Sequence, residues 1–269
     1  MKLLTGILRA LDPVQLWRDI YQTEPDPWQA EVLRSDHPRI ILNTTRQAGK
    51  STVVACKALH LGLYTPKSLI LLVSRSLRQS SELGRKLFDG FRALARPVPP
   101  EMESKLVLEL RNGSRIICLS GADEGSIRGF SGVTCLIIDE AARCPDALWI
   151  AVKPMVSVSR GAICLLSTPF GRRGFFWQTW AESDGWMKVE VKASQCPRLS
   201  AAFLQQERRE LGPRWNSQEY ECGFVEAEGQ IFSDEAIDAA FRDITPLFPE
   251  VEDIDEALLV DRPPLFAEE

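Results

Sequence analysis

Four short apolar runs, separated by segments long enough to form helices, limit the folds open to this chain of 269 residues. The runs predict strands at Arg39–Asn43, Ser68–Ser74, Val133–Ile138 and Ala162–Ser167. Near-continuous apolar strands are typical of a parallel sheet buried on both faces, with helices as the crossover connections. We therefore expect an α/β fold with a mainly parallel central sheet flanked by helices.

Helices are predicted between the runs, and a hairpin interrupts the alternation. The helical segments extend over about Lys50–Leu63 and Arg78–Leu94. Asn112-Gly113 lies between two strand-like runs, Leu106–Leu110 and Arg115–Leu119, and predicts a type I′ hairpin turn. Apolar residues recur at helical spacing near the N-terminus, and the chain becomes helical again after about residue 200.

Charge is unevenly distributed along the chain. The formal net charge is −5, with 45% hydrophobic and 26% charged residues, values that disfavour a disordered protein. Residues 243–269 carry nine acidic groups and one basic group, a net charge of −8. Residues 1–242 therefore have a net charge of +3, so the overall acidity does not exclude a nucleic-acid partner.

Cysteine usage and hydropathy suggest an intracellular protein without a membrane segment. Seven cysteines are scattered without a CxxC pair, and several lie in apolar runs, which favours free buried thiols. Arg9 and Asp12 interrupt the short apolar N-terminus, so an amphipathic helix is favoured over a signal peptide. No apolar stretch approaches the ~18 residues that a membrane span requires.

The segment TTRQAGKS (residues 44–51) lies between a predicted strand and a predicted helix. It matches the phosphate-binding pattern GxxxxGK[ST] at its last three positions, with Thr44 in place of the first glycine. Gly49 would let the backbone approach a phosphate, Lys50 would reach the β and γ phosphates, and Ser51 would ligate Mg²⁺. The alternative is a Gly-Lys-Ser helix start that binds nothing.

Two carboxylates follow the apolar strand CLII at its carboxyl end, where ligands bind in doubly wound folds. Asp139 would hold Mg²⁺, and Glu140 would act as general base on the water that attacks the γ phosphate. Acidic residues also favour helix starts, which is the structural alternative. Together, the two motifs predict ATP binding and hydrolysis. The expected fold is a P-loop NTPase of the RecA-like type, and the helical segment after about residue 200 would form a small linker subdomain.

The sequence resembles the DNA-packaging ATPase domain of the large terminase subunit of tailed bacteriophages over about residues 25–242. The similar segments are TTRQAGKST (Walker A), LIIDEAA (Walker B), Ser167-Thr168-Pro169 (coupling motif) and Pro27-Trp28-Gln29 (adenine motif). The resemblance implies ATP and Mg²⁺ as cofactors, with Ser51 and Asp139 as metal ligands. It implies that the nucleotide contacts Gln29, Thr45, Arg46, Gln47, Ala48, Gly49, Lys50, Ser51 and Thr52.

The resemblance also implies roles for particular side chains. Arg46, Lys50 and Glu140 would be catalytic, with Arg46 at the γ phosphate. Ser167 and Thr168 would couple hydrolysis to motion, and Arg128 is a candidate to act on a neighbouring subunit's ATP. The alternatives are a solvated arginine, a simple strand-terminating turn and a solvent-facing loop.

Basic side chains in two segments could contact DNA phosphates, although a solvated surface explains them equally well. They are Arg75, Arg78, Arg85, Lys86 and Arg92 in the first segment and Arg172 and Arg173 in the second.

The expected function is a motor that couples ATP hydrolysis to translocation of double-stranded DNA into a procapsid. The expected partners are DNA, further copies of the chain in a ring, the portal protein and the small terminase subunit, in the host bacterial cytoplasm and transiently at the portal. The alternatives are a nucleotide-binding adaptor, an inactive prophage remnant or a helicase-like translocase.

The predicted organisation has four parts: an N-terminal helical segment (1–24), a P-loop core (25–199), a helical linker subdomain (200–245) and an acidic tail (246–269). Large terminases usually continue into an RNase H-like nuclease, for which the residues after Arg242 are too few. We therefore expect no nuclease activity from this chain.

Overall fold

The computed structural model describes residues 2–122, 127, 129–225 and 240. The strands are β1 (Arg39–Thr44), β2 (Leu69–Ser74), β3 (Pro100–Glu103), β4 (Val107–Leu110), β5 (Arg115–Ser120), β6 (Cys135–Asp139), β7 (Ala162–Ser167) and β8 (Met187–Val191). The helices are α1 (Lys2–Leu11), α2 (Pro13–Tyr21), α3 (Pro27–Arg34), α4 (Lys50–Tyr64), α5 (Leu77–Ala93), α7 (Asp146–Val152), α8 (Gly174–Glu182) and α9 (Ala201–Tyr220).

The strands form one sheet with the order β3-β4-β5-β2-β6-β7-β1-β8. Strands β5, β2, β6, β7, β1 and β8 run parallel to one another, and β4 and β3 pair antiparallel at the β5 side of the sheet. The predicted α/β class with a mainly parallel sheet is thus confirmed. The four strands predicted from apolar runs occupy central positions, where both faces of the sheet are covered.

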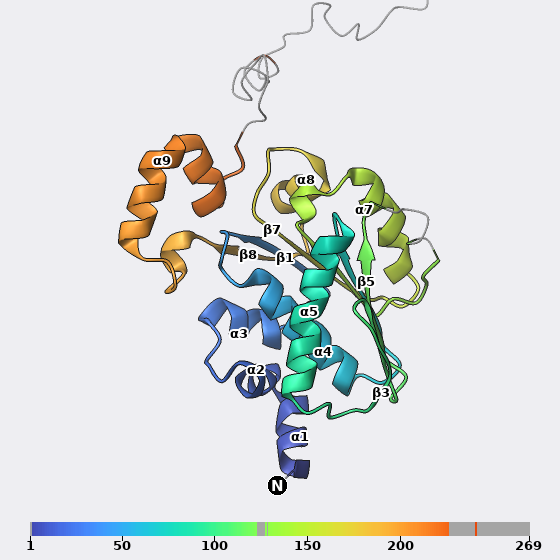
Figure 1. Ribbon diagram of the computed structural model, residues 1–269. Coiled ribbons are helices and arrows are strands. Elements are labelled where there is room, and N and C mark those ends of the chain that lie inside the picture. The colour runs from blue at the N-terminus through green and yellow to red at the C-terminus, as the bar shows by residue number, and fades with distance from the viewer. Residues whose placement is uncertain (1, 123–126, 128, 226–239, 241–269) are drawn as a thin grey trace, which may run out of the picture. The chain divides into compact units, whose positions relative to one another are not determined.

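Neighbouring residues along each central strand enter two different cores, because successive side chains of a strand point to opposite faces. Ile40 and Leu42 pack in the core that includes α2, α3, α4 and α5. Ile41 and Leu165 pack in the core that includes α7 and α8. The result is a sheet between two layers of helices, and α4 and α5 lie on one face of it in Figure 1.

The carboxyl ends of β1, β7 and β6 meet at one edge of the sheet. Asn43 pairs with Ser167 across β1 and β7, and Leu166 pairs with Asp139 across β7 and β6. Because the three strands are parallel and in register, the loops that follow them converge. This convergence brings the loop after β1 together with segments that lie 88 and 118 residues further along the sequence.

The hairpin between β4 and β5 differs from the predicted turn. A type I′ turn requires positive φ at both central residues, but only Gly113 (φ 82°) has it, and Asn112 does not. The Leu110 N–H donates to the Ser114 carbonyl (2.9 Å), which closes a three-residue loop. The Asn112 side chain instead accepts from the Ser114 N–H (3.0 Å) and donates to the Gly62 carbonyl (2.9 Å).

Helix α9 is interrupted near its middle by Gly212 (φ 75°) and Pro213, which separate its two helical halves. The compact unit of the fold extends from the N-terminus to Val225 and includes this helix. The predicted acidic tail (246–269) lies outside the described residues, and the domain boundaries proposed from sequence stay predictions.

All seven cysteines lie within the described residues, and each is a buried free thiol, as expected from their apolar context. Burial raises the pKa of several of these thiols, that of Cys118 to about 12. Among the helices of the described segments, none combines the length and apolar character needed to cross a bilayer.

Candidate nucleotide-binding site

The loop between β1 and α4 adopts a conformation suited to anion binding. Gln47 (φ 64°) and Gly49 (φ 93°) are both left-handed, a conformation that is rare for a residue with a side chain. In the described part of the chain, the N–H groups of residues 47–51 donate to no protein acceptor. Unpaired N–H groups at the start of a helix form a site for phosphate oxygens.

Thr44 replaces the first glycine of the sequence pattern without distorting the loop. It is the last residue of β1, is fully buried and pairs with Val191 of β8, so its backbone is extended. The flexibility of glycine is therefore not required at this position. The left-handed residues that bend the loop come later, at 47 and 49.

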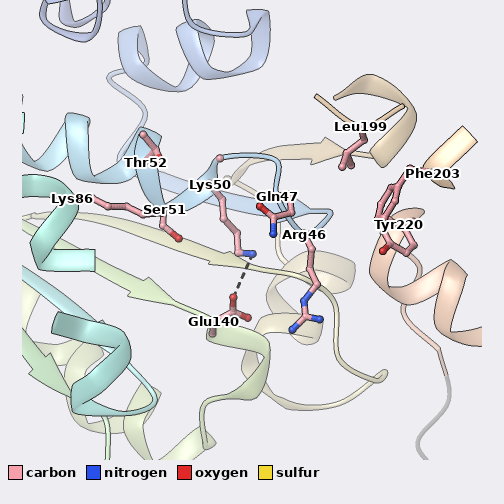
Figure 2. Close-up of a pocket in the computed structure, with 11 residues that line it drawn as sticks. Arg46, Gln47, Lys50, Ser51, Thr52, Lys86, Glu140, Leu199, Phe203 and Tyr220 are labelled. Carbon is pink, nitrogen blue, oxygen red and sulfur yellow. Dashed lines mark ion pairs between the residues drawn. The ribbon is translucent and has the colours of Figure 1, made fainter. Parts of the chain in front are cut away.

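Three strand ends converge on the Lys50 ammonium group. Its Nζ lies 3.3 Å from Glu140 Oε1, after β6, and donates to Thr168 Oγ1 (3.4 Å), after β7. Figure 2 shows Lys50 extending from the loop toward Glu140. The structure thus brings together the predicted phosphate-binding lysine, general base and coupling threonine. The neighbouring Ser167 is buried, and its hydroxyl donates to the Thr168 carbonyl (2.7 Å).

Ser51 and Asp139 are the other predicted pair, and their side chains are in contact. Ser51 Oγ donates to Asp139 Oδ2 at 3.2 Å, and the Glu140 N–H donates to Asp139 Oδ1 at 2.9 Å. Burial and the neighbouring Glu140 raise the pKa of Asp139, while Lys50 and these two hydrogen bonds oppose that rise. A buried carboxylate beside a hydroxyl provides the oxygen ligands that Mg²⁺ prefers.

A cavity of about 630 Å³ opens above the loop. Its lining residues are Arg46, Gln47, Gly49, Lys50, Ser51, Thr52, Lys86, Glu140, Leu199, Phe203 and Tyr220. One part of the lining is polar and comes from the loop, and the other is apolar and aromatic and comes from the segment around α9. This volume is in the range of small-molecule sites.

Four lining residues were not predicted as nucleotide contacts. Leu199, Phe203 and Tyr220 come from the region around α9, where no local sequence pattern marks a binding residue. Lys86 was considered only as a possible DNA contact on α5. It faces the cavity, and burial lowers its pKa.

Gln29 lies behind the loop and braces it. Its Oε1 accepts from the Asp26 N–H (2.9 Å), and its Nε2 lies 3.4 Å from the Ala48 carbonyl, to which it donates. Arg198 donates to the same carbonyl (2.9 Å) and pairs with Asp26 (2.7 Å). Gln29 is buried and is not a lining residue of the cavity. Adenine recognition by Gln29 stays a prediction.

The remaining predicted residues are placed as follows. Thr45 and Ala48 are buried, and neither lines the cavity; the Thr45 hydroxyl donates to the Glu219 carbonyl at 2.8 Å. Arg46 lines the cavity and pairs with Glu219 through Nε (3.2 Å). Arg128, the candidate for action on a neighbouring subunit, lies outside the described residues.

This combination of a strand, a phosphate-type loop, a helix and converging carboxylates defines the class of P-loop proteins with a RecA-like fold. Comparison with known families is more specific. Residues 41–239 match the model for the terminase large subunit, T4likevirus-type, N-terminal. The match covers well over half of the chain, so the chain belongs to this family of large terminase subunits.

Solved structures agree with this assignment at the level of the fold. The large terminase ATPase domain of Thermus phage P74-26 superimposes with a TM-score of 0.70 at 19% identity, covering 80% of this chain and 100% of that one. The HK97 bacteriophage large terminase gives a TM-score of 0.55 at 16% identity, covering 77% of this chain and 45% of that one.

A further large terminase, from a thermophilic bacteriophage, has been solved in complex with ADP and with ATP-γ-S. Both complexes superimpose with a TM-score of 0.60, at 13% and 14% identity, covering 74% of this chain and 53% of that one. The present chain therefore spans about half the length of these two full large terminases. At such identities the likeness establishes the shared fold.

Proposed function

We propose that this chain is the ATPase motor domain of a DNA-packaging terminase. The observation that carries the proposal is the contact of Lys50 with both Glu140 and Thr168 at the mouth of the phosphate-type loop. A phosphate-binding lysine and a carboxylate that can position the attacking water are groups that phosphoanhydride hydrolysis uses, and Thr168 is bonded to that lysine. Membership of the large terminase family supplies the DNA-packaging context.

Each group has a role in the proposed reaction. The free N–H groups of residues 47–51 and Lys50 would bind the phosphates, and Glu140 would orient and deprotonate the attacking water. Ser51 and Asp139 fit Mg²⁺, which when bound would neutralise phosphate charge. The apolar cavity wall of Leu199, Phe203 and Tyr220 would contact the base. Thr168 would sense the γ phosphate through its bond to Lys50.

Glu140 is also the residue whose neutralisation tests the proposal best. In the structure its carboxylate pairs with Lys50, so nucleotide phosphates would compete for the lysine and release Glu140 toward water. Glu140→Gln keeps the side chain's size and removes the base. We expect ATP turnover to fall by about 100-fold or more, the usual contribution of a general base, while ATP-γ-S still binds.

The matched control is Glu190→Gln on β8, whose carboxylate lies 3.6 Å from Lys192 and does not line the cavity. This variant should turn over ATP like the wild type. Equal rates for the wild type and Glu140→Gln would refute the assigned base. If Glu140→Gln kept full ATP turnover while Glu190→Gln lost it, the catalytic base would not be Glu140.

Coupling to DNA is the second part of the proposal. We expect the motor to act as a ring of copies at a portal, with the small terminase subunit as a further partner, in the host cytoplasm and at the procapsid. A motor requires no base readout, since phosphate contacts suffice for translocation. Stimulation of turnover by double-stranded DNA in the presence of portal would support a motor, and turnover indifferent to DNA would favour the adaptor. Absence of nuclease activity stays a prediction, to be checked with Mn²⁺ and plasmid DNA.

A further inference from the structure

One acidic residue outside the Walker A, Walker B, coupling and adenine motifs is held against the phosphate-type loop. Glu219, near the end of α9, is buried, and its carboxylate lies between two arginines. Oε2 is 3.2 Å from Nε of Arg46 in the loop, and Oε1 is 3.6 Å from Arg143, which follows β6. The carboxylate thus connects the segments that follow β1 and β6 to helix α9.

The backbone of Glu219 contacts the same loop. Its carbonyl accepts from the Thr45 hydroxyl (2.8 Å) and from the Arg46 N–H (3.4 Å). The next residue, Tyr220, lines the nucleotide cavity. Side-chain and main-chain contacts of Glu219 therefore fix the position of the end of α9 relative to the beginning of the loop.

These contacts restrict the conformation of the Arg46 side chain at the nucleotide cavity. Its side chain is 68% exposed, whereas the side chain of Glu219 is 10% exposed, so the fixed partner is the carboxylate. An exposed arginine samples many rotamers, and confining it at the moment of binding costs entropy. The contact is an ion pair and not a hydrogen bond, because Glu219 Oε2 has no hydrogen-bond partner among the described residues. The guanidinium N–H groups of Arg46 are therefore available to donate to a ligand. Figure 2 shows Arg46 and Lys50 extending from the loop in the same direction.

We propose that Glu219 is a positioning residue that holds Arg46 ready for the γ phosphate and so enables the site to distinguish a nucleoside triphosphate from a diphosphate. The inference rests on the proposed nucleotide-binding function and adds a residue to it. Arg143, 3.6 Å from Oε1, adds a second positive charge beside Glu219, and a buried carboxylate needs such compensating charge. Glu219 acts through Arg46 and does not itself contact the nucleotide.

The test is the ratio of the affinities for Mg²⁺–ATP-γ-S and Mg²⁺–ADP, measured by calorimetry with the full chain. The variants are Glu219→Gln, Arg46→Ala and the double variant, with Glu210→Gln as control. Glu210 is an exposed carboxylate on the same helix, bonded to Gln206. We expect Arg46→Ala to lower the ratio about 10-fold, as for loss of one charge-assisted contact, and Glu219→Gln to lower it about 3- to 10-fold.

Dependence on Arg46 is what separates positioning from a merely structural role. In the Arg46→Ala background, Glu219→Gln should change the ratio no further, because the pair acts as one unit. Glu219→Asp, which retains the charge, should restore part of the discrimination and provides a second variant if Glu219→Gln unfolds. Glu210→Gln should match the wild type.

Three outcomes would overturn the inference. The first is an unchanged ratio in both Glu219 variants, and the second is an effect of Glu219→Gln that persists in full without Arg46. Either would leave the proposed function intact if Glu140→Gln still abolishes turnover. The third is a wild-type chain that binds neither nucleotide, which would refute the proposed function and this inference together.

Discussion

Replacement of Gly49 by alanine tests the loop geometry directly. Gly49 has a φ of 93°, and an added Cβ would lie 2.7 Å from Nε2 of Gln29. Gln29 cannot move aside freely, because it is buried and its Oε1 accepts from the Asp26 N–H. Gly49→Ala therefore combines backbone strain with a collision against a fixed amide.

The two costs can be separated by a matched glycine. Gly185 has a φ of 73°, and nothing lies within 4 Å of an added Cβ, so Gly185→Ala should show strain alone. A left-handed residue with a side chain costs about 1–2 kcal/mol. Displacing Gln29 forfeits its hydrogen bonds, at about 0.5–1.5 kcal/mol each. Gly49→Ala should then lower the free energy of unfolding by about 2–5 kcal/mol.

Urea unfolding of both variants measures the difference, and ATP-γ-S binding should fall only in Gly49→Ala, whose loop is distorted. In a Gln29→Ala background the collision disappears, so the excess cost of Gly49→Ala over Gly185→Ala should shrink. Equal stability losses for the two glycine variants would refute the reasoning. The reasoning would also be refuted if Gly49→Ala lowered the free energy of unfolding equally in the wild-type and Gln29→Ala backgrounds.

Two further predictions concern stability. Burial lowers the pKa of His60, whose Nε2 lies 3.0 Å from the Arg9 carbonyl. As pH falls, the imidazole is therefore protonated in the unfolded chain before it is protonated in the folded chain. The free energy of unfolding should then decrease as pH drops below about 6.5. Urea unfolding at about pH 7.5 and 5.5 checks this, and an equal decrease in His60→Gln would contradict it. Lys57 donates to three carbonyl oxygens at the end of α3 (2.7–3.2 Å), so Lys57→Met should cost about 1–3 kcal/mol by leaving them without a donor. The control is Lys192→Met at a half-exposed position, which should unfold at nearly the same urea concentration as the wild type. An equally small effect of Lys57→Met would show that its three hydrogen bonds contribute nothing to stability.

Elements whose signal is local were predictable. The strands β1, β2, β6 and β7 are continuous apolar runs because both faces of the sheet are covered, and the structure places them within one or two residues of the prediction. Strand β8 (Met187–Val191) was not predicted, since it lies at the sheet edge and its burial alternates. Strand β3 was missed because prolines precede and begin it, and prolines are typical of sheet edges.

The turn between β4 and β5 shows the limit of local rules. Asn-Gly predicts a type I′ turn when nothing else acts on it. Here the Asn112 amide donates to the carbonyls of Gly62 and Leu63 at the end of α4. That tertiary contact accompanies a three-residue loop with positive φ at Gly113 alone.

The sequence predicts the phosphate-type loop, its lysine and the carboxylates after β6, because each motif occupies a few consecutive residues at the end of a strand. Their meeting at one edge follows from parallel strands. The opposite wall of the cavity is different: Phe203 and Tyr220, with Glu219 next to Tyr220 in the chain, lie more than 150 residues beyond the loop, and no local pattern assigns them to a nucleotide site. Only the folded chain decides that α9 closes against the loop, because that contact depends on packing between distant segments and not on any neighbour in sequence.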